Sequence, residues 1–174
     1  LMLIGGGGRE HAILRSLKKN PAVETVWMLP GNGAMESEAV CYPIGATDLD
    51  GIVAFAKANK VDYAVVAPDD PLVLGCVDRL NELGIPCFGP KANAAIIEGS
   101  KAFSKDLMKK YGIPTAAYEI FTELDAALEY LKTAPIPTVV KADGLALGKG
   151  VIIAQTREEA VEAVTDMMAN AKFG

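Results

Sequence analysis

The sequence predicts an α/β protein that begins with a doubly wound parallel sheet. Short apolar runs alternate with stretches of helical periodicity through residues 1–99. Most of these runs end at glycine or proline, and the first run, Leu1 to Ile4, is followed by four glycines, Gly5 to Gly8. A strand, a glycine turn and a helix in this order make the first unit of a doubly wound fold.

Composition is that of an ordinary globular protein. The 174 residues are 51% apolar and 22% charged. A chain of this length makes one large or two small domains and buries roughly 70% of its extended surface. The net charge of −5 argues against non-specific nucleic-acid binding. No apolar run approaches the roughly 20 residues of a membrane span. We therefore expect a soluble, cytoplasmic protein without nucleic-acid or membrane partners.

The three cysteines, Cys41, Cys76 and Cys87, lie in apolar surroundings. Their odd number argues against a disulfide framework, and their spacing is not that of metal ligands. We expect them to be small, reduced core side chains.

The glycine turn opens a helix at Arg9-Glu10-His11, whose apolar positions fall on one face. A dinucleotide fingerprint fails in both registers, because Glu10 or His11 takes the place of its third glycine. After the next strand, Thr25 to Leu29, Pro30-Gly31-Asn32 replaces the ribose-binding acid, which disfavours a nicotinamide or flavin cofactor. Glycine N–H groups and Arg9 could hold an anion. A tight turn with nothing bound is the alternative.

Further strands and helices follow in alternation. We expect strands at 39–44, 61–67 and 85–88, a helix from Asp48, and one helix that carries Leu72 through Leu80 and ends at Gly84. Ligands of a parallel sheet bind beyond the carboxyl ends of its strands, where 5–9, 30–32 and 68–70 lie. Asp69 and Asp70 fit such a site, or could simply cap a helix start.

The second part begins at Ser100, a good N-cap for a helix over 101–111. Lys101 lies in its first turn, where the helix dipole disfavours a cation unless a phosphate is present; a solvated lysine is the alternative. We then expect strands at 118–121, 138–142 and 151–155, and two helices that open with capping boxes at Thr122 and Thr156. The last helix is expected to bury Ala160, Val161, Val164, Met167 and Met168.

A glycine-rich loop with two lysines follows the strand at 138–142. Lys141 ends the strand and Lys149 lies in the loop, among Gly144, Gly148 and Gly150. Glycines let a loop backbone approach a ligand closely, and the lysines favour an anion, so the pattern indicates a polyphosphate such as a nucleotide. It is not a P-loop, because glycine follows Lys149 and a strand follows the loop. A flexible hairpin with solvated lysines is the alternative.

Three segments taken together resemble the phosphoribosylamine–glycine ligase (glycinamide ribonucleotide synthetase) family of the ATP-grasp superfamily. They are G-G-G-G-R-E-H-A at 5–12, E-G-S-K-A-F at 98–103 and K-A-D-G-L-A-L-G-K-G at 141–150. The resemblance covers the whole chain. It implies a Rossmann-like N-terminal domain at 1–99, the start of an ATP-grasp core at 100–117, and a β-α-β-β-α lid subdomain at 118–174 that is incomplete at its C-terminus.

The resemblance also implies an activity: ATP-dependent joining of glycine to 5-phosphoribosylamine through glycyl phosphate, in purine biosynthesis. The small-molecule partners would be these three substrates, and we expect a monomer or weak dimer. No catalytic residue is identified within the chain. The implied ATP-binding residues are Lys101, Lys141, Asp143, Gly144, Leu145, Gly148, Lys149 and Gly150. The implied phosphoribosylamine-binding residues are Gly6, Gly7, Gly8, Arg9, Glu10, Gly31, Asn32 and Asp69.

The chain departs from the family pattern at 67–72. It has A-P-D-D-P-L where the family has G-P-E-A-P-L, so the acid is one methylene shorter and the role of Asp69 stays open. The family's Mg²⁺ or Mn²⁺ ligands, adenine hinge, C-terminal domain and a further strand are expected beyond Gly174, so this chain alone should be inactive. A different ATP-grasp carboxylate–amine ligase, or a nucleotide-binding module without chemistry, remains an alternative.

Overall fold

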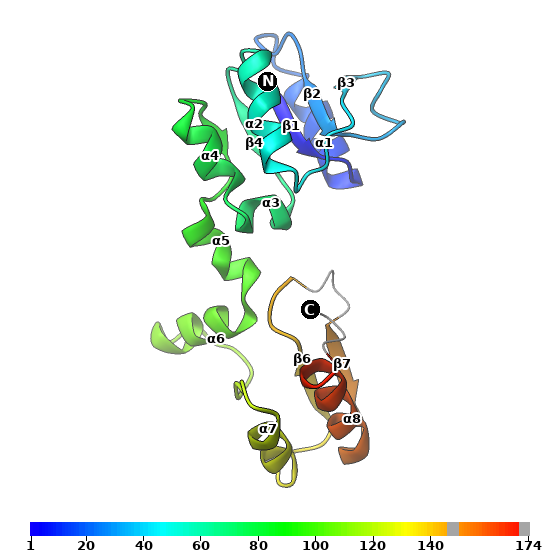
Figure 1. The fold of residues 1–174 in the computed structure, drawn as a ribbon, viewed down its shortest axis with the longest axis vertical. Coiled ribbons are helices and arrows are strands. Elements are labelled where there is room, and N and C mark those ends of the chain that lie inside the picture. The colour runs from blue at the N-terminus through cyan, green and yellow to red at the C-terminus, as the bar shows by residue number, and fades with distance from the viewer. Residues whose placement is uncertain (146–149, 171–174) are drawn as a thin grey trace. The chain divides into compact units, whose positions relative to one another are not determined.

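Five parallel strands form the sheet of the first unit in the order β3-β2-β1-β4-β5. The strands are β1 (Met2–Gly5), β2 (Trp27–Pro30), β3 (Val40–Cys41), β4 (Ala64–Val66) and β5 (Cys87–Phe88). The computed structural model describes residues 1–145 and 150–170 (Figure 1). It divides into two units, Leu1–Gly99 and Ser100–Gly174. The predicted α/β class with a parallel sheet is confirmed.

Helices cover both faces of this sheet because side chains alternate along each strand. Met2 and Ile4 pack with helices α2 (Leu49–Ala58), α4 (Cys76–Glu82) and α5 (Ala92–Gly99), while Leu3 packs with Leu14 of α1 (Gly8–Leu17) on the other face. All three strand side chains are fully buried, which stabilises the fold by about 1.5–3 kcal/mol each. Connections that run to both faces produce a doubly wound sheet.

The helix predicted between 69 and 84 is two helices, α3 (Asp69–Val73) and α4. Gly75 lies between them with a φ of 86°, a left-handed conformation that interrupts the helical hydrogen bonds. Helix α5 was not predicted, because the apolar residues of A-N-A-A-I-I-E-G show no clear one-sided pattern. Cys76 is buried, and burial raises the pKa of its thiol to about 12, so this cysteine is an inert core residue as expected.

The second unit holds a two-stranded antiparallel sheet, formed by β6 (Thr138–Lys141) and β7 (Val151–Ala154). Helices α7 (Leu124–Leu131) and α8 (Arg157–Met168) pack on one face of this sheet through Leu131, Ala154 and Val164. Helix α6 (Lys101–Lys110) begins the unit, and Ser100 caps it by accepting a hydrogen bond from the N–H of Phe103, as predicted.

Three expectations for this unit are wrong. Residues 118–121 form no strand in the described structure, since no neighbouring segment pairs with them; Phe121 instead packs against the core of the unit. Helix α7 starts at Leu124 after Glu123, with no side-chain cap, so Thr122 makes no capping box. Val161 of α8 is exposed, although it was expected to be buried.

Every helix in the described ranges is too short or too polar to span a bilayer.

Candidate functional site

The glycine turn after β1 is held by a buried carboxylate. Glu10 is 4% exposed, and its Oε2 accepts a hydrogen bond from the N–H of Gly7 at 2.7 Å. Its Oε1 accepts one from Nε of Arg9 at 2.9 Å, and this hydrogen bond raises the pKa of Arg9. Gly5 has a φ of 118°, and a Cβ there would overlap the Glu10 side chain. The turn therefore needs glycine for conformation and for space.

The turn after β2 lies directly against the first one. Gly31 N–H donates to the carbonyl of Gly5 at 3.2 Å, and the Asn32 side-chain amide donates to the carbonyl of Gly6 at 2.7 Å. A methyl group on Gly6 would overlap the Gly31 carbonyl oxygen. The two turns thus approach each other as closely as two backbones can.

The turn after β4 completes this edge of the sheet. Asp69 starts α3, and its Oδ1 lies 4.0 Å from a guanidinium nitrogen of Arg9. Asp69 and Asp70 both lie in the first turn of α3, behind Pro68 at the N-cap, and not at the N-cap itself. The structure therefore brings all eight residues predicted to bind phosphoribosylamine to one edge of the sheet, at the carboxyl ends of β1, β2 and β4.

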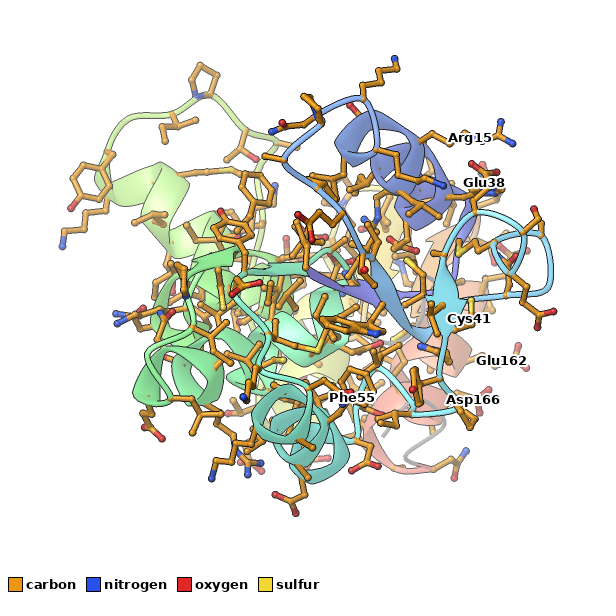
Figure 2. The ribbon with its side chains drawn as sticks, turned by 90° about the horizontal axis from the view of Figure 1, so that it is seen from above. Arg15, Glu38, Cys41, Phe55, Glu162 and Asp166 are labelled. Atoms are coloured by element: carbon orange, nitrogen blue, oxygen red, sulfur yellow. The ribbon has the colours of Figure 1, made fainter. Side chains whose placement is uncertain are left out.

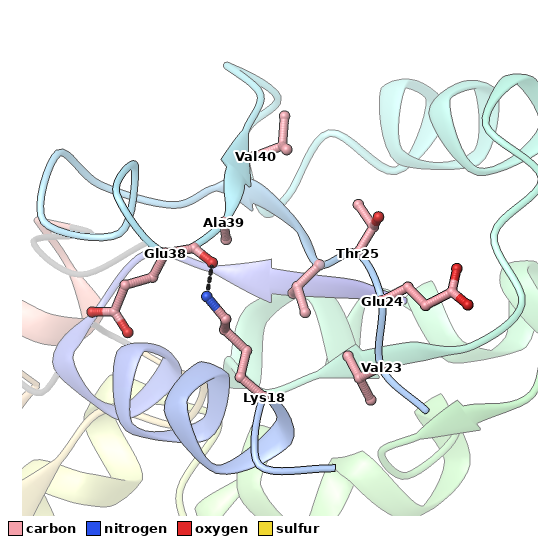
Figure 3. Close-up of a pocket in the computed structure, with 8 residues that line it drawn as sticks. Lys18, Val23, Glu24, Thr25, Glu38, Ala39 and Val40 are labelled. Atoms are coloured by element: carbon pink, nitrogen blue, oxygen red, sulfur yellow. Dashed lines mark hydrogen bonds between the residues drawn. The ribbon is translucent and has the colours of Figure 1, made fainter. Parts of the chain in front are cut away.

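A cluster around Glu38 was not predicted. His11 and Arg15 of α1 both hydrogen bond its carboxylate, and Figure 2 labels Arg15 and Glu38. The ammonium of Lys18, the C-cap of α1, donates to the Glu38 carbonyl at 2.6 Å (Figure 3). The hydrogen bonds from Arg15 and His11 lower the pKa of the Glu38 carboxyl to about 2. They connect Glu38, in the segment between β2 and β3, to α1. The spacing of His11, Arg15 and Lys18 was the available signal in the sequence.

A shallow cavity of about 190 Å³ lies beside this cluster. Lys18 and Glu38 line it together with residues that lead into β2 and β3, so it opens at the amino ends of these strands (Figure 3). None of the predicted site residues lines it. The cavity is therefore separate from the three turns at the carboxyl ends.

In the second unit, Lys141 shares a sheet face with exposed apolar side chains. The antiparallel register pairs Val139 with Ile153 and Lys141 with Val151. Val139, Val151 and Ile153 are 48%, 43% and 63% exposed, whereas Val140 on the opposite face packs against the core of the unit. The lysine was predicted and this apolar face was not, because T-V-V-K and V-I-I-A are almost continuously apolar and show no alternation that would mark an exposed face.

The segment that follows β6 is attached to the start of α6. The Lys101 ammonium donates to the carbonyl of Gly144 at 2.6 Å, and Asp143 accepts hydrogen bonds from Ser100 and Ala102. Lys101 thus has a protein partner, which the predictions of a phosphate or of solvent did not include. Gly148 and Lys149 lie outside the described residues, and Leu145 and Gly150 are at least half-buried. That Lys101 and Lys141 both bind ATP stays a prediction.

Comparison with known proteins identifies both units. The family described as "Phosphoribosylglycinamide synthetase, N domain" matches residues 1–98, and "Phosphoribosylglycinamide synthetase, ATP-grasp (A) domain" matches residues 99–174. The two matches follow one another along the whole chain.

Relatives and a solved structure agree with this match. The chain is 49% identical to "Phosphoribosylamine--glycine ligase" of Allochromatium vinosum and 48% identical to that of Halalkalibacterium halodurans, covering all of this chain and 41% of each relative. The crystal structure of phosphoribosylamine–glycine ligase from Thermotoga maritima is 36% identical with a TM-score of 0.73, covering 92% of this chain and 37% of that one. The chain spans about two fifths of the length of these relatives. It belongs to the phosphoribosylglycinamide synthetase family, with residues 1–98 matching the N domain and residues 99–174 matching the ATP-grasp (A) domain.

Proposed function

We propose that the full-length protein catalyses the ATP-dependent ligation of glycine to 5-phosphoribosylamine, giving glycinamide ribonucleotide, ADP and phosphate. The observation that carries the proposal is the gathering of a glycine turn, Arg9, Asn32 and Asp69 at one edge of the sheet, in a chain that matches this family from end to end. The relatives named phosphoribosylamine–glycine ligase support the same reaction.

The three turns of the first unit suit a phosphorylated sugar amine. The first N–H groups of α1 have no intrahelical partner, and the Gly8 position has open space around it, so a phosphate could approach the start of this helix. Arg9 adds a guanidinium for the same phosphate. The Asp69 carboxylate and the Asn32 amide could accept and donate hydrogen bonds to ribose hydroxyls.

The exposed face of the β6–β7 sheet suits a nucleotide. Val139, Val151 and Ile153 offer apolar surface for a base, and Lys141 at the end of β6 offers an ammonium for phosphate. Lys101 would provide a second ammonium from the start of α6. We assign ATP to the second unit on these grounds, with the loop at 144–150 as the predicted cover that excludes water.

The reaction needs two bond exchanges. A glycine carboxylate oxygen attacks the γ-phosphorus of ATP and the bond to the ADP oxygen breaks, which gives glycyl phosphate. The amine of 5-phosphoribosylamine then attacks the acyl carbon, the C–O bond to phosphate breaks, and the amine loses a proton to leave an amide. The role of the described residues is to hold and orient charged groups, because phosphoryl transfer depends on positioning and electrostatic stabilisation.

Mg²⁺ or Mn²⁺ is expected to accompany ATP. Within residues 1–145 and 150–170, no group of three or more His, Cys, Asp or Glu side chains could hold a metal ion. The described residues therefore do not fit a metal site, and none of the steps above passes through a metal that they hold.

The proposal is tested by measuring ADP release from the full-length enzyme. We expect release to require glycine and 5-phosphoribosylamine together. Lys141→Met should raise the KM for ATP about 10- to 100-fold, because a hydrogen bond to a charged group is worth about 1.5–3 kcal/mol. Lys132→Met is the control. Lys132 is exposed and follows α7, which packs on the opposite face of the β6–β7 sheet, so this variant should keep a KM for ATP near the wild-type value.

Two results would contradict the proposal. One is ADP release that depends on a different carboxylate and amine, which would indicate another ligase of the same superfamily. The other is an equal effect of the Lys141 and Lys132 substitutions on the KM for ATP, because only Lys141 lies on the exposed apolar face.

A further inference from the structure

The carboxylate of Asp143 is bound to the start of helix α6. The Ser100 hydroxyl donates to its two oxygens at 2.9 and 3.2 Å, and the N–H of Ala102 donates to Oδ1 at 3.1 Å. The same hydroxyl accepts a hydrogen bond from the N–H of Phe103 at 3.0 Å. Asp143 therefore extends the cap of α6, at the helix end where a negative charge is favourable.

The Asp143 carboxyl is held in its ionised form. Burial by itself would raise the pKa of this carboxyl, but hydrogen bonds from Ala102, Ser100, and the backbone of Lys101 and Gly144 together lower the pKa below its usual value. An ionised carboxylate accepts hydrogen bonds only, so it offers nothing to a phosphate oxygen and repels it. The donors at α6 account for both of its oxygens.

The residue after Asp143 holds the Lys101 side chain. Gly144 has a φ of 91°, and its carbonyl accepts the hydrogen bond from the Lys101 ammonium at 2.6 Å. Asp143 and Gly144 thus hydrogen bond three consecutive residues at the start of α6, which are Ser100, Lys101 and Ala102. An ammonium has three donors, so Lys101 keeps two for an anion while the Gly144 carbonyl fixes its direction.

We infer that Asp143 is a positioning residue of the nucleotide site and does not itself contact ATP. By anchoring the 143–144 turn to α6, it places the Gly144 carbonyl, and through that carbonyl it directs the Lys101 ammonium toward the ATP phosphates. This replaces the expectation that Asp143 binds ATP directly. The inference rests on the proposed function, because ATP is the ligand that the second unit is proposed to bind.

The test measures the Kd of a nonhydrolysable ATP analogue by calorimetry with the full-length enzyme and its variants. Asp143→Ala should raise the Kd about 10-fold, and Asp143→Asn should restore it to within about 3-fold of wild type, because the amide oxygen can still accept from Ala102 or Ser100. Lys101→Met should also raise the Kd. The double variant should bind like Lys101→Met alone, since Asp143 acts through that lysine.

The double-mutant comparison separates positioning from other roles. Additive effects of the two substitutions would overturn the inference, because they would mean that Asp143 acts independently of Lys101. An increase in Kd in Asp143→Asn as large as in Asp143→Ala would overturn it too, because the negative charge of Asp143 would then itself affect ATP binding. An unchanged Kd in Asp143→Ala would also reject it. If Asp143→Ala does not fold, Ser100→Ala removes one donor, and its effect on the Kd should likewise vanish in the Lys101→Met background.

The proposed function can fail without deciding this inference. ADP release that does not require glycine and 5-phosphoribosylamine would reject the ligase, whereas the Kd for the analogue depends on neither compound. A coupled loss of analogue affinity at Asp143 and Lys101 would then still establish the positioning role.

Discussion

At the scale of single residues, the turns are held by side chains that belong to the turns themselves. Glu10 uses one carboxylate oxygen for the N–H of Gly7 and the other for Arg9. Leaving such a buried carboxylate without partners costs several kcal/mol, so these contacts are needed for the turn to form. Glu10 therefore shapes the proposed phosphoribosylamine site from within, and Arg9 is the more exposed group that a ligand would meet.

The Glu38 cluster predicts how stability depends on pH. The folded-state pKa of about 2 is below the usual value of 4.5, so its contribution is complete above pH 4.5 and is lost as pH falls toward 2. We expect the melting temperature of the wild-type chain to fall more steeply between pH 5 and pH 2.5 than that of Glu38→Gln, which cannot titrate. Thermal denaturation followed by circular dichroism measures this.

The matched control for this prediction is Glu36→Gln, which neutralises an exposed carboxylate two positions away in the same segment. Its melting curve should keep the steep wild-type dependence on pH. Parallel pH profiles for wild type and Glu38→Gln would mean that the contacts with Arg15 and His11 contribute nothing to stability.

At the scale of elements, two similar sequence signals had different outcomes. Thr156 accepts a hydrogen bond from the N–H of Glu159 at 3.2 Å, and the Glu159 carboxylate accepts one from the N–H of Gln155 at 2.7 Å. The matching pattern at Thr122 forms no such bonds, because α7 begins one residue later than the pattern requires. The N-cap threonine of α8 was predicted correctly, but Glu159 bonds the residue before the cap, so the predicted capping box forms only in half. The first helical residue depends on how the helix packs.

These two threonines make a matched pair for mutation. Thr156→Ala should lower the free energy of unfolding of the second unit by about 1 kcal/mol, the typical cost of losing an N-cap side chain. Thr122→Ala should change it by less than about 0.5 kcal/mol, as exposed substitutions usually do. Urea unfolding followed by circular dichroism gives both free energies of unfolding. Equal decreases for the two variants would show that the hydrogen bond from Thr156 at the N-cap adds no stability to the second unit.

Most elements could be predicted because periodicity and turn residues agree along the chain. The division at Gly75 could not, since glycine in an apolar helical pattern is compatible with either a continuous or an interrupted helix. The strand at 118–121 was predicted from local preference, but a strand forms only where a neighbour accepts its hydrogen bonds. The positions of the three turns followed from the general rule for parallel sheets.

At the scale of the whole molecule, each unit has its own apolar core. Leu80 belongs to the core of the first unit, Trp27 packs against that core, and Leu131 belongs to the core of the second unit. Side-chain partners across long sequence separations could not be predicted: Lys101 and Gly144 are 43 residues apart, and nothing in either local pattern links them. The sequence indicated which residues are chemically suitable, and the fold decided their neighbours.

Separate cores predict separate responses to core mutations. Trp27 is the single tryptophan, so its fluorescence reports on the first unit. Leu131→Ala should destabilise the second unit by about 2–5 kcal/mol and leave the urea midpoint of Trp27 fluorescence unchanged. Leu80→Ala should lower that midpoint. Comparing fluorescence with circular dichroism tests this, and a fluorescence midpoint that shifts in Leu131→Ala would mean that the two units unfold together.

The central place of β1 in its sheet has a further consequence. Its turn has the turn of β2 on one side and that of β4 on the other, so a compound held there would fasten together three stretches of chain that are remote in sequence. Binding of such a compound would raise the free energy of unfolding of this unit by about 2.7 kcal/mol when its free concentration is a hundred times its Kd, and so would raise the melting temperature. Weakening any single turn would then reduce both the affinity and the thermal protection.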